Sequence, residues 1–183
     1  IRGAVERLRT VALEPLLANA GAGQTMADGV TLFHADHGNI AAAGSALTLT
    51  SLSAARTAMR RQRGLQGELY AVEPFAILVP PELETVAQQA IAEVQAAKFS
   101  DANPFSGALE VITEPGLADA GAWYVAGNPS SHDGLAIAYL DGQAAPRVES
   151  KPGWETLGVE LRLVWAVDAK FIEHAAWYRN AGA

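Results

Sequence analysis

Apolar positions recur at helical spacing in three segments of the chain. This spacing predicts helices over residues 3–19, 51–63 and 81–97. Pro15 falls inside the first segment, where it predicts a kink or an early end. The second segment begins at a serine that can cap a helix and stops at Gly64, a favoured helix terminator. The third opens with prolines and glutamates, which suit a first helical turn, and continues as an apolar stripe.

Strand-like alternation dominates the second half of the chain. Strands are expected at 108–113, 122–126, 135–141 and, most strongly, 158–168. In the last segment one face carries Val159, Leu161, Leu163, Trp165 and Val167, and the other carries Glu160, Arg162, Val164, Ala166 and Asp168. Residues 68–79 are also β-rich and end in an apolar run. Together with the helices, these strands predict an α+β fold.

Residues 24–50 follow neither period. They contain Thr31-Leu-Phe33, then Gly38-Asn39, then a run of alanine, glycine and serine up to Ala46. A long segment without regular structure inside a compact domain is typical of a functional loop or of an arm that packs elsewhere. We therefore expect this segment to find its partners on another surface.

The composition predicts a folded domain and argues against several classes of partner and chemistry. Half of the 183 residues are hydrophobic and 18% are charged, which is enough for a core and too little charge for a disordered chain. The chain begins at Ile1 and shows neither a signal peptide nor an apolar run of the ~20 residues that cross a bilayer, so we expect a cytoplasmic protein with no membrane partner. The absence of cysteine excludes disulfides and thiolate chemistry. The net charge of −7 argues against a general attraction to DNA.

One basic cluster departs from this acidic balance. Arg56, Arg60, Arg61 and Arg63 lie on the helix predicted at 51–63, where they would place positive charge on an exposed face. A solvated face or a salt-bridging interface is the expected role. Contact with nucleic acid is the alternative.

The sequence His34-Ala-Asp36-His37 is the only dense group of side chains that can bind a metal. A spacing of three residues would bring both imidazoles near one ion, with Asp36 as an oxygen ligand. No glutamate lies between the histidines to act as a base, and the flanking residues have the composition of a loop. We expect these side chains to bond nearby backbone or an adjacent subunit, with a metal-dependent hydrolase as the alternative.

No other motif predicts catalysis. Ser130-Ser-His132-Asp133 holds the residue types of a catalytic triad, but they are contiguous in a loop, whereas triads are assembled from distant segments. The sequence has neither a nucleophile elbow nor a glycine-rich phosphate loop. We therefore expect no catalytic residue, no cofactor and no metal, and a protein that is not an enzyme.

Several fragments, taken in order along the chain, resemble one family. They are Met26-Ala-Asp-Gly29, Leu32-Phe-His-Ala-Asp-His-Gly-Asn39, Leu78-Val-Pro-Pro-Glu-Leu-Glu84, Asn103-Pro104, Leu109-Glu-Val-Ile112, Trp123-Tyr124, Leu140-Asp-Gly-Gln143, Trp177-Tyr-Arg-Asn180 and Gly182. The set resembles the Mu-like major head subunits of tailed phages, including the capsid half of prohead protease–capsid fusion proteins. Residues 169–176 depart from the end of that family, and its usual N-terminal portion is not in this sequence.

The resemblance implies the tailed-phage major capsid fold, with an extended loop, a spine helix, a β-rich peripheral domain and an α/β axial domain. On this chain it assigns 1–23 to an N-terminal helix or arm remnant, 24–50 to the extended loop and 51–67 to the spine helix region. Residues 68–133 would form the axial-type domain, and 134–183 the peripheral-type segment.

The resemblance also implies a function. It predicts a structural subunit that assembles with itself into pentamers, hexamers and an icosahedral head, enclosing DNA without sequence-specific binding. A prohead protease and a scaffold would be further partners, and the virion, assembled in the bacterial cytoplasm, its location. An encapsulin-like shell of a cellular compartment is the alternative on the same fold. Contacts between subunits are expected at Phe33, His34, Asp36, His37, Arg56, Arg60, Arg61 and Arg63.

Overall fold

A sheet of four short strands forms the centre of the fold. The computed structural model describes residues 2–64, 67–92, 108–153 and 157–183. Within them, Pro74–Val79 (β1), Glu110–Thr113 (β2), Trp123–Gly127 (β3) and Trp177–Asn180 (β8) pair in the order β2-β1-β3-β8. β1 is parallel to β2 and antiparallel to β3, and β3 is antiparallel to β8. The apolar run of β1 follows from this central place, because both faces of the strand are covered.

The described helices are α1 (Arg2–Leu17), α2 (Leu49–Arg60) and α3 (Glu84–Ile91), with short 3₁₀ turns at Asn19–Gly21, Ala35–His37, Pro81–Leu83 and Leu140–Gly142. α2 and α3 pack on one face of the sheet, toward Ile77, Trp123 and Val125. The intervening residues Leu78 and Tyr124 face the opposite side, because successive side chains of a strand alternate. That second core also holds Leu16, Leu32, Phe33, Leu117 and Phe171.

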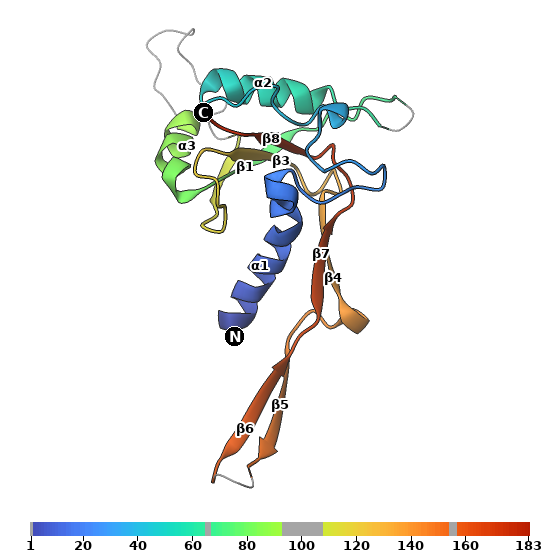
Figure 1. Cartoon of the computed structure of the whole chain (residues 1–183), viewed down its shortest axis with the longest axis vertical. Helices are drawn as coiled ribbons and strands as arrows, with labels where there is room; N and C mark the ends of the chain where they lie inside the picture. The colour runs from blue at the N-terminus through green and yellow to red at the C-terminus, as the bar shows by residue number, and fades with distance from the viewer. Residues whose placement is uncertain (1, 65–66, 93–107, 154–156) are drawn as a thin grey trace.

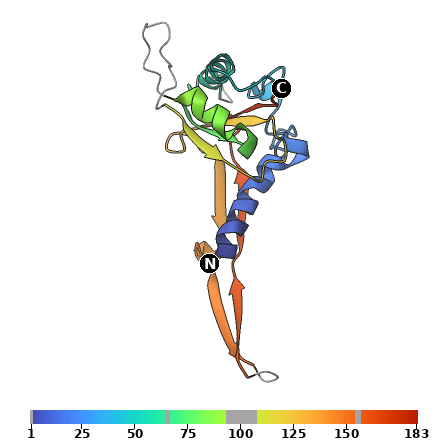
Figure 2. The same ribbon diagram turned by 90° about the vertical axis from the view of Figure 1, so that its left-hand side faces the viewer.

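A long two-stranded ribbon projects from this sheet (Figures 1 and 2). Its first half pairs β4 (Leu135–Tyr139) with β7 (Val167–Phe171), and its second half pairs β5 (Arg147–Pro152) with β6 (Val159–Val164), both antiparallel. α1 lies beside the first half, and its N-terminus points toward the second (Figure 2). In the chain, the ribbon leaves the sheet after β3 and returns to it at β8.

The predicted helices are confirmed, with shifted ends. α2 begins before residue 51 because Thr48 caps it: the Thr48 hydroxyl oxygen accepts from the Ser51 N–H, and the Ser51 hydroxyl oxygen accepts from the Thr48 N–H. α1 continues through Pro15, which lies in its last turn. The helix expected at 81–97 is a 3₁₀ turn followed by α3, which ends at Ile91. Residues 93–97 of that prediction lie outside the described residues.

The strand expected at 158–168 is two strands instead of one. The opposite strand of the ribbon is interrupted by the turn Leu140–Gly142, where Asp141 has a φ of 52°. β6 therefore pairs with β5, and β7 pairs with β4. β5 and β8 were not predicted. β5 is rich in charge and β8 has only four residues, and each forms because a neighbouring strand pairs with it.

The middle of the segment 24–50 packs on its own subunit, whereas its assignment as the extended loop stays a prediction. Leu32 and Phe33 are 0% and 2% exposed inside the second core of the same chain. The side-chain amide of Gln24 bonds both backbone groups of Phe171, at 2.8 and 3.0 Å. The backbone of the segment is satisfied by single bonds, such as those from the Leu32 N–H to the Gln24 carbonyl and from the Ala41 N–H to the Arg179 carbonyl, and not by a ladder. The part of the subunit that projects is the ribbon.

The segment 134–183 also divides differently from the prediction. Its last strand, β8, is the edge of the four-stranded sheet and is not part of the ribbon.

Among the residues that the structure describes, no helix has both the length and the hydropathy of a membrane span.

Candidate functional site

His37, predicted as a metal or contact residue, is buried and bonded on both sides of its ring. Nδ1 lies 2.9 Å from the carbonyl oxygen of Leu32, and Nε2 lies 2.7 Å from Oδ2 of Asp28. The ring stacks on His174, with centroids 4.0 Å apart and planes 9° apart. Because both nitrogens face oxygen atoms that accept hydrogen bonds, the ring has no lone pair directed at a metal.

The two neighbours of His37, Asp28 and His174, both have shifted pKa values. The pKa of Asp28 lies below its ordinary value, first because His37 donates a hydrogen bond to it and then because the Val30 N–H does. The pKa of His174 is lowered, first by burial and then by the neighbouring His37. The contacts therefore favour an ionised Asp28 and an uncharged His174 on either side of the His37 ring.

Asn39 completes this network. It is 0% exposed, and its side-chain amide donates to the carbonyls of Leu32 and His174 at 2.8 and 3.2 Å. Its Oδ1 accepts from the His34 N–H, and the Gln62 side chain donates to the His37 carbonyl at 3.1 Å. Through these contacts, Leu32–Asn39 holds the irregular segment against His174, at the end of the ribbon, and against Gln62, just after α2.

His34 and Asp36 form a local cap instead of a metal site. Nδ1 of His34 accepts from the Asp36 N–H at 3.2 Å, at the start of the turn Ala35–His37. The rings of His34 and His37 are 6.3 Å apart. Among the described residues, no three side chains of histidine, aspartate or glutamate come together in a way that would hold a metal. The geometry thus gives no support to the hydrolase alternative.

The remaining predicted contact residues divide into buried and exposed ones. Phe33 packs against Tyr124 inside the core, with ring centroids 5.5 Å apart. Arg60, Arg61 and Arg63 are exposed near the C-terminal end of α2, where positive charge suits the helix dipole. Arg60 pairs with Glu73 at 2.9 Å, and Arg63 donates to the carbonyl of Gly67. Arg56 is partly buried on the same helix.

The outer half of the ribbon has one apolar and one charged face. The pairing of β5 with β6 places Val148 beside Leu163, Ser150 beside Leu161 and Pro152 beside Val159 on the same side. The other face carries Arg147, Glu149, Lys151, Glu160, Arg162 and Val164. We call the first side the apolar ribbon face. Glu149 lies between Arg147, at 2.6 Å, and Arg162, so these three charges of the face pair within the subunit.

No described residue of the subunit buries the apolar ribbon face. Val148, Val159 and Leu161 are 63%, 67% and 73% exposed, and Leu163 is 46% exposed. Nearer the sheet, the same alternation gives Val167, Ala169 and Phe171, of which Ala169 and Phe171 are buried. There α1 provides the cover, because its leucines share a core with Phe171. The alternation at 158–168 was visible in the sequence, but its lack of cover was not.

The fold is that of a shell protein. The chain is similar to the holo-SrpI encapsulin complex of Synechococcus elongatus PCC 7942, with 14% identity and a TM-score of 0.54 over 98% of this chain and 62% of that one. It also matches the procapsid of satellite phage P4 with its size determination (Sid) protein, with 18% identity and a TM-score of 0.42 over 73% of this chain and 38% of that one. The chain thus spans less than two thirds of either protein's length.

The chain belongs to the phage capsid protein family, whose match covers residues 2–180. The comparison with curated proteins found no match. The predicted capsid fold is therefore confirmed. The finer assignment to Mu-like head subunits and protease fusions stays a prediction.

Proposed function

We propose that this protein is a structural subunit of a phage or prophage head, which assembles with copies of itself into an icosahedral shell around DNA. Membership of the phage capsid protein family supports this class. The observation that supports assembly is the apolar ribbon face, whose four aliphatic side chains are 46–73% exposed. A long apolar strand surface of this kind drives association with another chain.

A neighbouring copy is the partner that this face requires. The pairing of β5 with β6 is two strands wide among the described residues, and an isolated two-stranded ribbon is marginally stable in water. Contact with another subunit would stabilise the ribbon and cover its apolar side together. Obligate interfaces bury on the order of 2,000–5,000 Å² in total, and closed rings such as pentamers and hexamers are the symmetric way to repeat one contact.

The two parts of the subunit would take the two domain roles of a capsid protein. We propose the four-stranded sheet with α2 and α3 as the axial-type domain and the ribbon as the peripheral-type part. The spine helix was expected at 51–67, but α1 extends from the sheet alongside the first half of the ribbon (Figure 1), whereas α2 packs across the sheet. α1 is therefore the better candidate for the spine.

Exposed charge would set the register between subunits. Of the predicted contacts, Asp36, Arg60, Arg61 and Arg63 remain on the surface, where charge selects partners more than it adds affinity. Replacing Arg60 and Arg61 together by glutamate should block assembly and leave the subunit folded. Normal shells from that variant would remove these arginines from the interface.

The proposed partners follow from this role. The subunit would bind copies of itself, and it would enclose DNA without reading its sequence, since a net charge of −7 gives no general attraction to phosphate. A prohead protease and a scaffold would act during assembly in the bacterial cytoplasm, and the mature location would be the virion. In this role the protein has no catalytic residue and no cofactor.

A compartment shell is the second candidate, because the fold is also similar to that of an encapsulin. The contents of assembled particles separate the two candidates. Packaged DNA supports the phage head, whereas an enclosed protein cargo supports the compartment.

Negative-stain microscopy with light scattering tests the proposal directly. Shells, or rings of five or six subunits, that appear above a threshold concentration are the expected result. A protein that stays monomeric over a wide range of concentration and salt would contradict it.

A further inference from the structure

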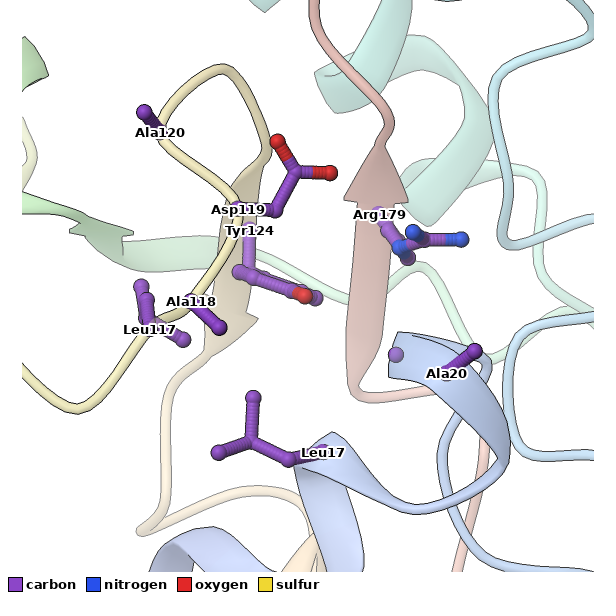
Figure 3. A pocket seen from close by; sticks show the side chains of 9 residues that line it. Leu17, Ala20, Leu117, Ala118, Asp119, Ala120, Tyr124 and Arg179 are labelled. Carbon is purple, nitrogen blue, oxygen red and sulfur yellow. The ribbon is translucent and has the colours of Figure 1, made fainter.

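A cavity of about 520 Å³ lies between the end of α1, the loop before β3 and the edge of the sheet (Figure 3). Leu17 and Leu117 contribute apolar wall, and Tyr124 and Arg179 contribute polar wall. The two polar residues are direct cross-strand partners on β3 and β8. The volume lies within the range of small-molecule sites.

Among the described residues, the guanidinium of Arg179 has no ion-pair partner. Its backbone is tied on both sides, because the N–H donates to Asn39 and the carbonyl accepts from Ala41, both at 2.9 Å. Within the described residues, no carboxylate forms an ion pair with this side chain, and its Nε is buried without a hydrogen-bond partner. A buried donor left unpaired is unfavourable. The described residues thus hold the planar guanidinium in place and form no ion pair with it.

Tyr124 offers a second donor beside it. Burial, the larger effect, raises the pKa of Tyr124, and Arg179 opposes that rise, so the hydroxyl keeps its proton at neutral pH. Asp119 lies on the rim, where its Oδ1 accepts from the Gly121 N–H at 3.1 Å. This negative charge opposes a doubly charged ligand more strongly than a singly charged one.

A strained turn forms the wall next to the guanidinium. Asn19, Ala20 and Gly21 are consecutive left-handed residues, with φ of 51°, 56° and 84°. The Asn19 side-chain amide holds the turn by donating to the Gly23 carbonyl at 2.8 Å. A Cβ on Gly21 would lie 3.3 Å from Nη2 of Arg179, so a side chain at this position would crowd the guanidinium. Backbone strain that shapes a cavity is characteristic of ligand sites.

We propose that this cavity binds a carboxylate that carries an apolar body. The planar fork of Arg179 matches the two oxygens of a carboxylate, and the Tyr124 hydroxyl donates to one of them. Leu17 and Leu117 contact the apolar body. The carboxylate has two available sources: a free aliphatic acid, or the acidic side chain of a neighbouring copy.

Sodium octanoate is the probe, and octanamide is its uncharged match. Isothermal titration of the chain should show octanoate binding at least about tenfold more tightly than octanamide, since a hydrogen-bonded charge contributes that much. Arg179→Met should weaken octanoate binding by about tenfold or more. It should also raise the thermal midpoint of the unliganded subunit, because it removes an unpaired buried donor. Arg162→Met, on the charged face of the ribbon, is the control that should leave both values unchanged.

Arg179→Lys keeps the charge without the fork, and it should give an intermediate affinity if the methionine variant fails to fold. Octanoate binding that is the same in wild type and Arg179→Lys, or absent from wild type, overturns the proposal. A lower midpoint for unliganded Arg179→Met also overturns it, because Arg179 would then be a structural residue.

Self-association, measured by light scattering, identifies the source of the carboxylate. If octanoate binds and leaves self-association unchanged, the site takes a free acid. If octanoate weakens self-association in wild type, and Arg179→Met weakens it without octanoate, a neighbouring copy fills the site. Both outcomes support the cavity as a carboxylate site.

Discussion

Replacing Leu161 and Leu163 by serine tests whether the apolar ribbon face is an assembly surface. The two side chains are 73% and 46% exposed, which is slightly more than one leucine side chain in total. Full burial of one leucine is worth about 1.5–3 kcal/mol. If a neighbouring subunit buries both, the substitutions cost about 2–4 kcal/mol for each contact, or about 30- to 700-fold in the concentration at which assembly begins.

The matched control is the pair Glu160→Ser and Arg162→Ser. It places two serines in the same strand, but on the charged face. It breaks the pair between Arg162 and Glu149, and an exposed pair of this kind contributes only about 0–1 kcal/mol. The control should therefore assemble at nearly the wild-type concentration.

Light scattering across a concentration series gives the onset of assembly, and circular dichroism gives the thermal midpoint of each variant. Both variants should melt close to wild type, because exposed substitutions usually change stability by about 0.5 kcal/mol or less. The reasoning is refuted if the leucine variant assembles at the wild-type concentration. It is refuted equally if the control loses assembly to the same extent.

The remaining predictions concern the subunit itself. Arg9→Met leaves the buried carboxylate of Glu114 without its 2.6 Å partner and should lower the free energy of unfolding by about 1–3 kcal/mol in urea. Gly23→Ala should destabilise the subunit by about 2 kcal/mol or more in the same assay, because φ is +80° and a Cβ would lie 2.5 Å from a core leucine. Gly29→Ala, with φ of +86° and open space around it, should cost only about 1 kcal/mol. The pKa of Asp28 is lowered on folding, so its contribution to stability is present above the ordinary pKa and is lost as pH falls through the folded one. The difference in thermal midpoint between wild type and Asp28→Asn should accordingly shrink from about pH 6 to pH 3, and a difference independent of pH would contradict the assigned pair.

Periodicity in the sequence predicted the elements that carry a strong pattern of their own. α2 and α3 were found because an apolar stripe recurs at helical spacing, and the strand near 160 was found because apolar and polar residues alternate there. β8 was missed because its four residues become a strand only by pairing with β3. The pattern shows which face of an element is apolar and does not show which other segment covers it.

The histidine motif shows the same limit for a candidate site. The sequence placed His34 and His37 near each other and raised a metal site or a contact surface. The partners of His37 that decide its role are Asp28, nine residues away, and His174, far along the chain. Composition and spacing could not reveal these partners. Nor could they reveal the cavity at Arg179, because its wall is assembled from α1, the loop before β3 and β8.

One continuous apolar face runs along the ribbon, from the core of the subunit to the exposed outer half. From Phe171 to Val159 the apolar positions keep a period of two, so the chain makes a single apolar face along β7 and β6. α1 covers the part near Phe171, and loss of apolar surface there acts on the stability of the subunit. The part from Leu163 to Val159 lies beyond the cover of the described residues. Under the proposed function, loss of apolar surface there would act on contact with another chain. The same residue types would then serve the core at one end of the ribbon and the shell at the other, with the length of the covering helix as the boundary between the two roles.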